Sequence, residues 1–316
     1  MNMLLQPAPL PEEMDQGYLG RIMRINGYRT VPATWQAVEE HLDAGAGAIK
    51  HELLSQMAGQ TSEQFAQNHT SIPLTRAIAV TSPKLPHGSM QRKGLLNKRT
   101  LCRGLQRVAL CEDCVNEDLA FHGVSYWRRD HQMPWQLWCP KHATALYYLE
   151  PRDSLFSSPE RVLGRCRSHC ADVVSEAQAN PFVQRLLDIA SAMYERPTPL
   201  DAQIAVRVLR DRGHKRGIPK GQDWSADHIM SKRIRAIFPD RWLCTVFGDE
   251  AVFNLGSIMH GHCVTDVSSF LLATAVLFET PDEAINTLSA PARRDSRHKF
   301  RRPNEVRRIS QAQYES

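Results

Sequence analysis

Two short motifs, Cys111-Glu-Asp-Cys114 and Cys139-Pro-Lys-His142, decide how the middle of this sequence folds. In each motif two residues separate the side chains that can bind a metal, so one tight turn can bring both to the same ion. Two such turns supply four ligands and close a tetrahedron. Three thiolates and one imidazole are a donor set typical of zinc. We therefore predict that Cys111, Cys114, Cys139 and His142 bind one structural Zn²⁺ that holds this region together.

Other interpretations of these cysteines remain open. The four residues could be buried thiols beside a surface histidine, or a catalytic zinc site in which one of them is not a ligand. A closed site leaves no position for a substrate or an activated water, which favours the structural interpretation. A second, more widely spaced pair is Cys166 and Cys170. These two residues either bind a second zinc ion or are ordinary thiols. The further ligands of that ion would have to come from Cys102, His260, His262 or Cys263.

The segment between the two motifs, Tyr126–Pro134, mixes aromatic and cationic side chains and can be interpreted in two ways. It could form a binding surface. It could instead be a helix that packs Tyr126 and Trp127 onto the metal-binding module, with His131 as a hydrogen-bonded structural residue. We favour the second interpretation.

Hydrophobic periodicity predicts a mainly α-helical chain with few strands. We expect an N-terminal helical segment with a basic stretch (1–108), a zinc-finger module (109–175), a helical C-terminal domain with helix-turn-helix-like elements (176–290) and a basic tail (291–316). Asn180-Pro181 and Asp201 are typical of helix starts, and Gly213 is expected to end the second of these helices. Thr280 and Glu283 fit a capping box.

The net charge is only +5, but the positive charges are clustered. Such clusters are either a solvated surface or a contact with a polyanion or an acidic protein. The clusters with predicted contacts to nucleic acid or a partner are Arg92, Lys93, Lys98, Arg99 and Arg103 in one stretch, and Lys232, Arg233 and Arg235 in an expected helix over 226–238. A third cluster follows residue 292.

Several classes of protein are disfavoured. No apolar run approaches the roughly 20 residues of a membrane span, and the N-terminus does not resemble a signal peptide, so we expect a cytoplasmic protein. A phosphate-binding loop, a dinucleotide fingerprint and a nucleophile elbow are all missing from the sequence. The residues show no other catalytic pattern, and a zinc nuclease is the least favoured hypothesis.

The central motifs and the N-terminus together resemble the TniQ/TnsD family of transposon targeting proteins. The central match comprises both metal motifs, Tyr126-Trp-Arg-Arg, His131-Gln and Leu146. The N-terminal match comprises Pro7-x-Pro-Leu-Pro-Glu12, Gly17, Leu19, Arg21 and Asn26-Gly27. The family often has a further cysteine pair soon after the second motif. Residues 147–164 contain no cysteine, which leaves only Cys166 and Cys170 for a second site.

The resemblance implies a function that the residues alone do not. Members of this family are not enzymes, so the resemblance implies that this chain is not one. They choose an insertion site and help to recruit an AAA+ ATPase regulator that activates the transposase. The short chain and the absence of a strong recognition helix favour the branch that acts as a homodimeric adaptor on an RNA-guided Cascade complex. Its expected partners are Cascade proteins, guide RNA, the AAA+ regulator and target DNA. The alternative is a TnsD-like protein that reads a DNA site itself.

Overall fold

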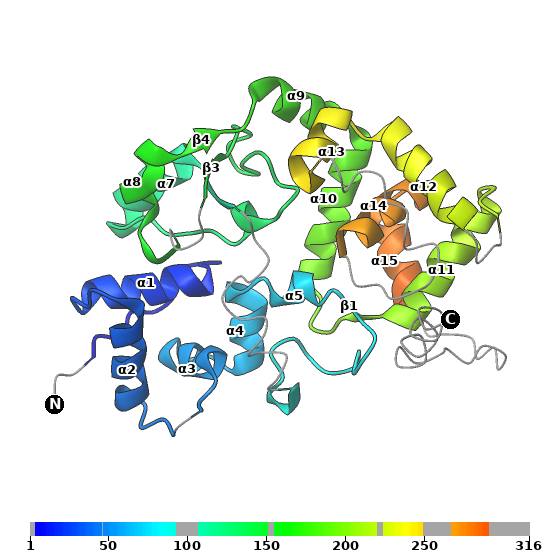
Figure 1. Cartoon of the computed structure of the whole chain (residues 1–316). Helices are drawn as coiled ribbons and strands as arrows, with labels where there is room; N and C mark the ends of the chain where they lie inside the picture. The colour runs from blue at the N-terminus through cyan, green and yellow to red at the C-terminus, as the bar shows by residue number, and fades with distance from the viewer. Residues whose placement is uncertain are drawn as a thin grey trace, which may run out of the picture.

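The computed structural model describes residues 4–45, 47–92, 107–150, 155–219, 224–248 and 267–290. Its architecture is mainly helical, as predicted, with short strands in the middle of the chain (Figure 1). Within the described residues, every helix is too short or too polar to cross a lipid bilayer.

The N-terminal part is a group of short helices that share one apolar core. The core contains Tyr18, Leu19, Leu54 and Phe65, all almost fully buried. Thr61 begins one of these helices with a capping box, in which the Gln64 side chain accepts a hydrogen bond from the Thr61 backbone N–H. The helices are α1 (Asp15–Ile25), α2 (Val31–His41), α3 (Lys50–Met57), α4 (Ser62–His69) and α5 (Ile72–Thr75).

Helix α1 lies directly against the middle of the chain. Two of its residues are glycines at close contacts: a Cβ atom on Gly17 would meet Trp127 at 3.2 Å, and one on Gly20 would meet the Phe156 carbonyl oxygen at 2.3 Å. The second distance is a severe overlap, so only glycine permits this approach at residue 20. Just before the helix, Glu13 forms an antiparallel bridge with Arg128.

The middle part is a three-stranded antiparallel sheet with a helix beside it. The strand order is β2 (Val108–Leu110), β3 (Tyr147–Leu149) and β4 (Arg167–Ser168), and Ala109 lies opposite Tyr148. One face of the sheet packs on Met14 and Trp127 through Val108 and Leu110. The helical elements of this part are α7 (Glu112–His122), α8 (Pro159–Val162) and the 3₁₀ turns Asp130–Gln132 and Leu163–Arg165.

The helix expected over Tyr126–Pro134 is wrong. This segment is extended and then forms only the 3₁₀ turn Asp130–Gln132, because its backbone bonds to the N-terminal strand-like segment instead of to itself. The expected packing does occur, since Tyr126 is 5% exposed and Trp127 1% exposed.

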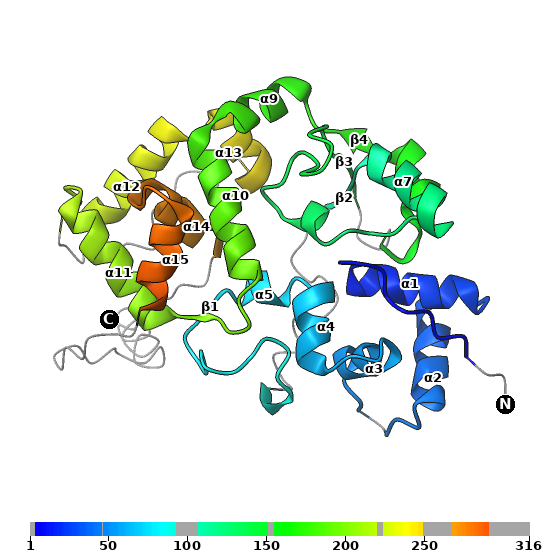
Figure 2. The same ribbon diagram turned by 180° about the vertical axis from the view of Figure 1, so that it is seen from behind.

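The C-terminal part is a helical bundle around a buried central helix. Helix α14 (Val267–Leu277) is apolar all round and buried along Ser269–Leu277. Around it lie α10 (Pro181–Tyr194), α11 (Ala202–Lys215), α12 (Trp224–Ile237) and α15 (Pro281–Ser289), as Figures 1 and 2 show from opposite sides. Helices α9 (Ala171–Ala179) and α13 (Asp240–Phe247) lie at the end nearest the sheet. A two-residue parallel pairing of β1 (Ile78–Ala79) with β5 (Leu200–Asp201) joins this bundle to the N-terminal part.

Two helix starts in this bundle lie where the sequence predicted them, and one helix end does not. The side chains of Asn180 and Asp201 accept hydrogen bonds from the first turns of α10 and α11, as predicted. Gly213 was expected to end α11 but lies buried inside it, and the helix continues to Lys215. Residues 216–223 then separate α11 from α12, a connection longer than the turn of a standard helix-turn-helix. The predicted domain boundaries remain predictions; that at 175/176 falls inside α9.

Candidate metal centre

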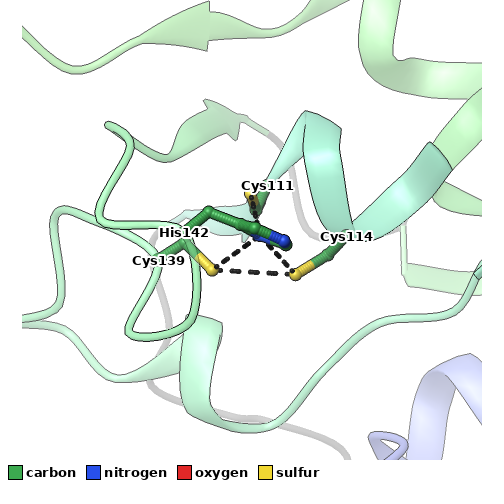
Figure 3. Close-up of side chains that lie close together, drawn as sticks. All are labelled: Cys111, Cys114, Cys139 and His142. Carbon is green, nitrogen blue, oxygen red and sulfur yellow. Dashed lines mark hydrogen bonds between the residues drawn. The ribbon is translucent and has the colours of Figure 1, made fainter. Parts of the chain in front are cut away.

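The four predicted ligands meet in one cluster, which comes from two turns (Figure 3). Cys111 follows β2 and is the N-cap of α7, and Cys114 lies in the first turn of that helix. Cys139 and His142 lie in a tight turn that is closed by the hydrogen bonds from Ala143 N–H to Cys139 O and from Cys139 N–H to Thr144 O, both 2.8 Å. All four ligand atoms lie within 4.8 Å of one another.

The spacing of these atoms suits zinc. Zn–S bonds of about 2.3 Å and Zn–N bonds of about 2.0 Å give a tetrahedron with S–S edges of roughly 3.8 Å and S–N edges of roughly 3.5 Å. The Sγ atoms of Cys114 and Cys139 are 3.6 Å apart. Nδ1 of His142 lies 3.5, 3.4 and 3.5 Å from the sulfurs of Cys111, Cys114 and Cys139 respectively. The cluster can therefore hold a metal ion, and its donor set and dimensions are consistent with zinc.

The thiols are strongly coupled to one another. A hydrogen bond between Cys114 and Cys139 raises the pKa of Cys114 and lowers the pKa of Cys139 to about 2. Burial raises the pKa of Cys111. The Cys114 and Cys139 sulfurs are 3.6 Å apart and buried. Without a cation between them, loss of the protons from both would place two negative charges side by side and largely out of water, which is unfavourable. A divalent ion removes this conflict, since it displaces both protons.

Glu117 is a part of the site that the sequence analysis missed. Its Oε1 lies 3.1 Å from His142 Nε2, the ring nitrogen that faces away from the sulfurs, and its other oxygen pairs with Lys141. The hydrogen bonds from Lys141 and His142 lower the pKa of Glu117, and the bond to Glu117 raises the pKa of His142. A carboxylate in this position fixes the ring of a metal-binding histidine with Nδ1 directed at the metal. The signal in the sequence was its position, three residues after Cys114 on the same helix.

His131 lies close to the cluster and is 2% exposed. Its Nε2 is 4.0 Å from Cys114 Sγ and 3.9 Å from the Asp130 carboxylate. Thr144 contacts a different sulfur, with Oγ1 3.5 Å from Cys111 Sγ and 3.3 Å from Asp113 Oδ2. Polar side chains therefore surround the sulfurs in addition to Glu117.

The more widely spaced pair is not part of this cluster. Cys166 Sγ contacts the Val162 carbonyl at 3.3 Å, whereas Cys170 is exposed at the start of α9 and lies 3.4 Å from the Arg241 guanidinium. Among the described residues, the only metal-type group is the one at residues 111–142. The other ligands considered for a second site, Cys102, His260, His262 and Cys263, lie outside the described residues, so that site remains a prediction.

The predicted basic contacts are placed only in part. Lys232 and Arg235 are exposed on α12, while Arg233 is half-buried beside Gly217 in the turn that follows α11. Arg92 is the last residue of the 3₁₀ turn Met90–Arg92, and its side chain lies outside the described set, as do Lys93, Lys98, Arg99, Arg103 and the tail 291–316. The contact role of all these residues remains a prediction.

The metal cluster and the N-terminal helices fall inside a region that matches a known family. The TniQ family model matches residues 4–146, which include both metal motifs, helix α1 and the strand β2. A search of curated proteins finds no match to the chain. The family-model match confirms the resemblance seen in the sequence over this region: residues 4–146 form a TniQ domain, the domain of transposition-associated targeting proteins.

Proposed function

We propose that this protein is a non-enzymatic targeting adaptor of a CRISPR-associated transposon. It links an RNA-guided Cascade complex, which recognises the target DNA, to the AAA+ regulator that activates the transposase. The observation that carries the proposal is the TniQ match over residues 4–146.

The metal cluster supports a structural role for the bound ion. All four ligands come from the chain and three of them are buried, so a Zn²⁺ ion in this cluster has no open position for a substrate. In this proposal the ion keeps the module folded and takes no part in chemistry.

An exposed apolar group at the C-terminal end of α7 and just after it supports a protein partner. Leu119, Phe121 and Val124 lie within six residues, and Phe121 is 84% exposed. Single exposed apolar residues are common, but a group around an exposed phenylalanine is typical of an interaction surface. The N-terminal end of the same helix is acidic, with Glu112 and Asp113 in its first turn. We assign this surface, Leu119–Val124, to contact with a protein of the targeting complex.

The test is co-expression of a tagged full-length chain with a candidate Cascade and its guide RNA, followed by affinity purification and zinc analysis. We expect recovery of the ribonucleoprotein with about one zinc per chain and, by light scattering, a dimer of the chain. The variant Phe121→Ser should reduce recovery of Cascade or the regulator without loss of zinc, whereas Leu5→Ser, at another exposed apolar residue, is the matched control. Purification of a zinc-loaded chain that binds neither Cascade nor the AAA+ regulator would contradict the proposal.

One observation favours the alternative of a TnsD-like DNA reader. Lys232 and Arg235 are exposed on α12, where a helix could approach the DNA backbone or a groove. This alternative predicts protection of a defined duplex without any guide RNA. Lys232→Gln together with Arg235→Gln should then abolish protection. Binding that is weak, steeply salt-dependent and indifferent to sequence would exclude it.

A further inference from the structure

A cavity of about 350 Å³ lies between the sheet formed by β2, β3 and β4 and the C-terminal helices. One wall is the sheet face that carries Arg107, Ala109 and Tyr148, together with His169 at the end of β4. The other wall comes from the end of α13, and both views show α13 and the sheet at the same end of the molecule (Figures 1 and 2). The rest of the lining includes Gln132, Met133, Gln136, Thr245, Phe247 and Ser268. The lining contains none of the four metal ligands, although His131, which lies 4.0 Å from Cys114 Sγ, is part of it.

The sheet wall presents a row of flat groups. Ala109 lies opposite Tyr148 in the register of β2 and β3, and Arg107 is two residues before Ala109 on the same face. The Arg107 guanidinium lies 5.0 Å from the centre of the Tyr148 ring, and the His169 ring stacks on Tyr148 at 4.6 Å with an angle of 28° between the planes. The Arg107 guanidinium, the Tyr148 ring and the His169 ring therefore form one stack of planar groups along this wall, and a further flat group can extend that stack.

The charge of the lining is one-sided. Among the described residues that line the cavity none is a carboxylate, whereas Arg107 is a permanent cation. Arg107 Nε lies 3.2 Å from Glu150 Oε1, but the two side chains are 40% and 60% exposed. An ion pair so open to water contributes little, so an incoming anion can replace Glu150 at small cost.

From this arrangement we propose that the cavity binds one nucleotide unit, with its base against the Tyr148–His169 wall and its phosphate on Arg107. All nucleic-acid bases can stack on aromatic rings, so this contact does not depend on the nucleotide sequence. Arginine provides a planar, permanently charged partner for phosphate. The cavity lies within the range of volumes typical of small-molecule sites and can admit one base with its sugar. The nucleotide can belong to a single strand of RNA or DNA or be free in solution; the chemistry of recognition is the same.

This inference does not rest on the proposed adaptor function. A purified chain can bind a nucleotide in this cavity whether or not it binds Cascade, and the experiment below uses the full chain alone. Failure of the cavity test therefore leaves the adaptor proposal in place, and failure to capture Cascade leaves the cavity proposal in place.

The experiment measures binding of fluorescent single-stranded RNA and DNA oligonucleotides to the zinc-loaded full chain by anisotropy at several salt concentrations. Tyr148→Leu removes the ring and should weaken binding by roughly 5- to 100-fold, whereas Tyr148→Phe keeps the ring and should bind like the wild type. Arg107→Gln should reduce the slope of log K against log salt by about one, and Arg107→Lys should retain that slope. Zinc content and circular dichroism check that each variant is folded.

The matched controls change similar residues outside the cavity. Tyr28→Leu removes a half-buried ring outside the cavity, and Arg161→Gln removes an exposed cation from α8; both should leave affinity unchanged. Competition with AMP separates the sources: displacement of the oligonucleotide indicates a site for free nucleotides, and no displacement indicates a site for a strand. Equal affinities of the wild type and Tyr148→Leu would overturn the proposal. So would saturable binding of N-acetyltryptophanamide with no nucleotide binding, which would assign the cavity to a partner's aromatic side chain.

Discussion

The backbone N–H of Met14 donates a hydrogen bond of 2.8 Å to the carbonyl oxygen of Trp127. This bond joins the start of α1 to the segment between the two metal motifs. The buried Trp127 ring packs against Gly17, and its Nε1 donates to the Ser157 carbonyl at 2.7 Å. The N-terminal helices and the metal-binding module therefore form one packed structure, and Trp127 lies at its centre.

Replacement of Trp127 should destabilise this part of the chain severely. Trp127→Ala leaves a large cavity between α1 and the sheet and should cost about 3–5 kcal/mol of the free energy of unfolding. Urea denaturation followed by circular dichroism measures the loss. Phe121→Ala removes an almost fully exposed ring and is the control, with little expected change. Similar stabilities of the two variants would show that the Trp127 contact contributes little.

Removal of the metal should unfold the module. Without zinc, burial disfavours the thiolate of Cys111, and the hydrogen bond to Cys139 disfavours the thiolate of Cys114, so the metal is needed to hold all three thiolates together. Chelation, or Cys114→Ser, should lower the melting temperature and increase hydrogen exchange in residues 108–149. The exposed Cys170 provides the control, because Cys170→Ser should retain the full zinc content and stability. Loss of zinc from Cys170→Ser would instead assign that residue to a metal site.

Glu117 should set the affinity for zinc without being a ligand. Glu117→Gln removes the carboxylate that accepts from His142 Nε2 and should weaken zinc binding by about 10- to 100-fold, by the usual range for such partners. The loss should fall near the lower limit, because the Glu117 side chain is 45% exposed. Competition with a chromophoric chelator measures the change. Glu176→Gln on α9 should have no effect, and an unchanged affinity in Glu117→Gln would exclude the role.

Acid should destabilise the N-terminal helices through His69. Burial is the main cause that lowers the pKa of His69 to about 4, while Nδ1 donates to the Glu13 carbonyl at 3.0 Å. The folded pKa lies below the unfolded value, so the unfolded state takes up the proton first. This contribution to stability is complete above about pH 6.5 and is lost as the pH falls towards 4; its upper limit is roughly 3 kcal/mol.

Burial lowers the pKa of His51 as well, so its contribution has the same sign. The measurement is the difference in unfolding free energy between the wild type and His69→Gln, determined at pH 7 and again at pH 5. Any loss of stability from the release of zinc in acid affects both proteins equally and therefore cancels in this difference. We expect this difference to shrink at pH 5. His41→Gln, at an exposed histidine, should show no such change. A difference independent of pH would show that His69 titrates normally.

The sequence predicted those features that depend on neighbouring residues. The four metal ligands and the caps at Asn180 and Asp201 each follow from the spacing of residues within a short motif. The helix expected over Tyr126–Pro134 failed because its residues pair with Glu12 and Met14, more than a hundred positions away. Gly213 did not end α11 because the buried packing of that face outweighs the cost of glycine in a helix.

The strands and the cavity could not be predicted from the sequence, because they too depend on contacts between distant residues. Strands β2, β3 and β4 have only two or three residues each, too few for an alternating pattern to be visible. The cavity joins Arg107 to Phe247 and Ser268, which meet only once the bundle has packed on the sheet. Glu117 was overlooked because acidic residues are common on exposed helices, so its position three residues after Cys114 is a weak signal until the distance to His142 is known.

The pairing of Glu12 with Arg129, 117 positions later, has a consequence for synthesis of the chain on the ribosome. Helix α1 is made first but its partners Trp127 and Arg129 are made much later, and the last metal ligand, His142, later still. The core that α1 shares with α2, α3 and α4 can form early, but the face of α1 at Gly17 stays uncovered until Trp127 and the second metal motif have left the ribosome. A shortage of zinc during translation would lengthen the time for which this surface of the nascent chain is uncovered. Aggregation would then occur before folding is complete.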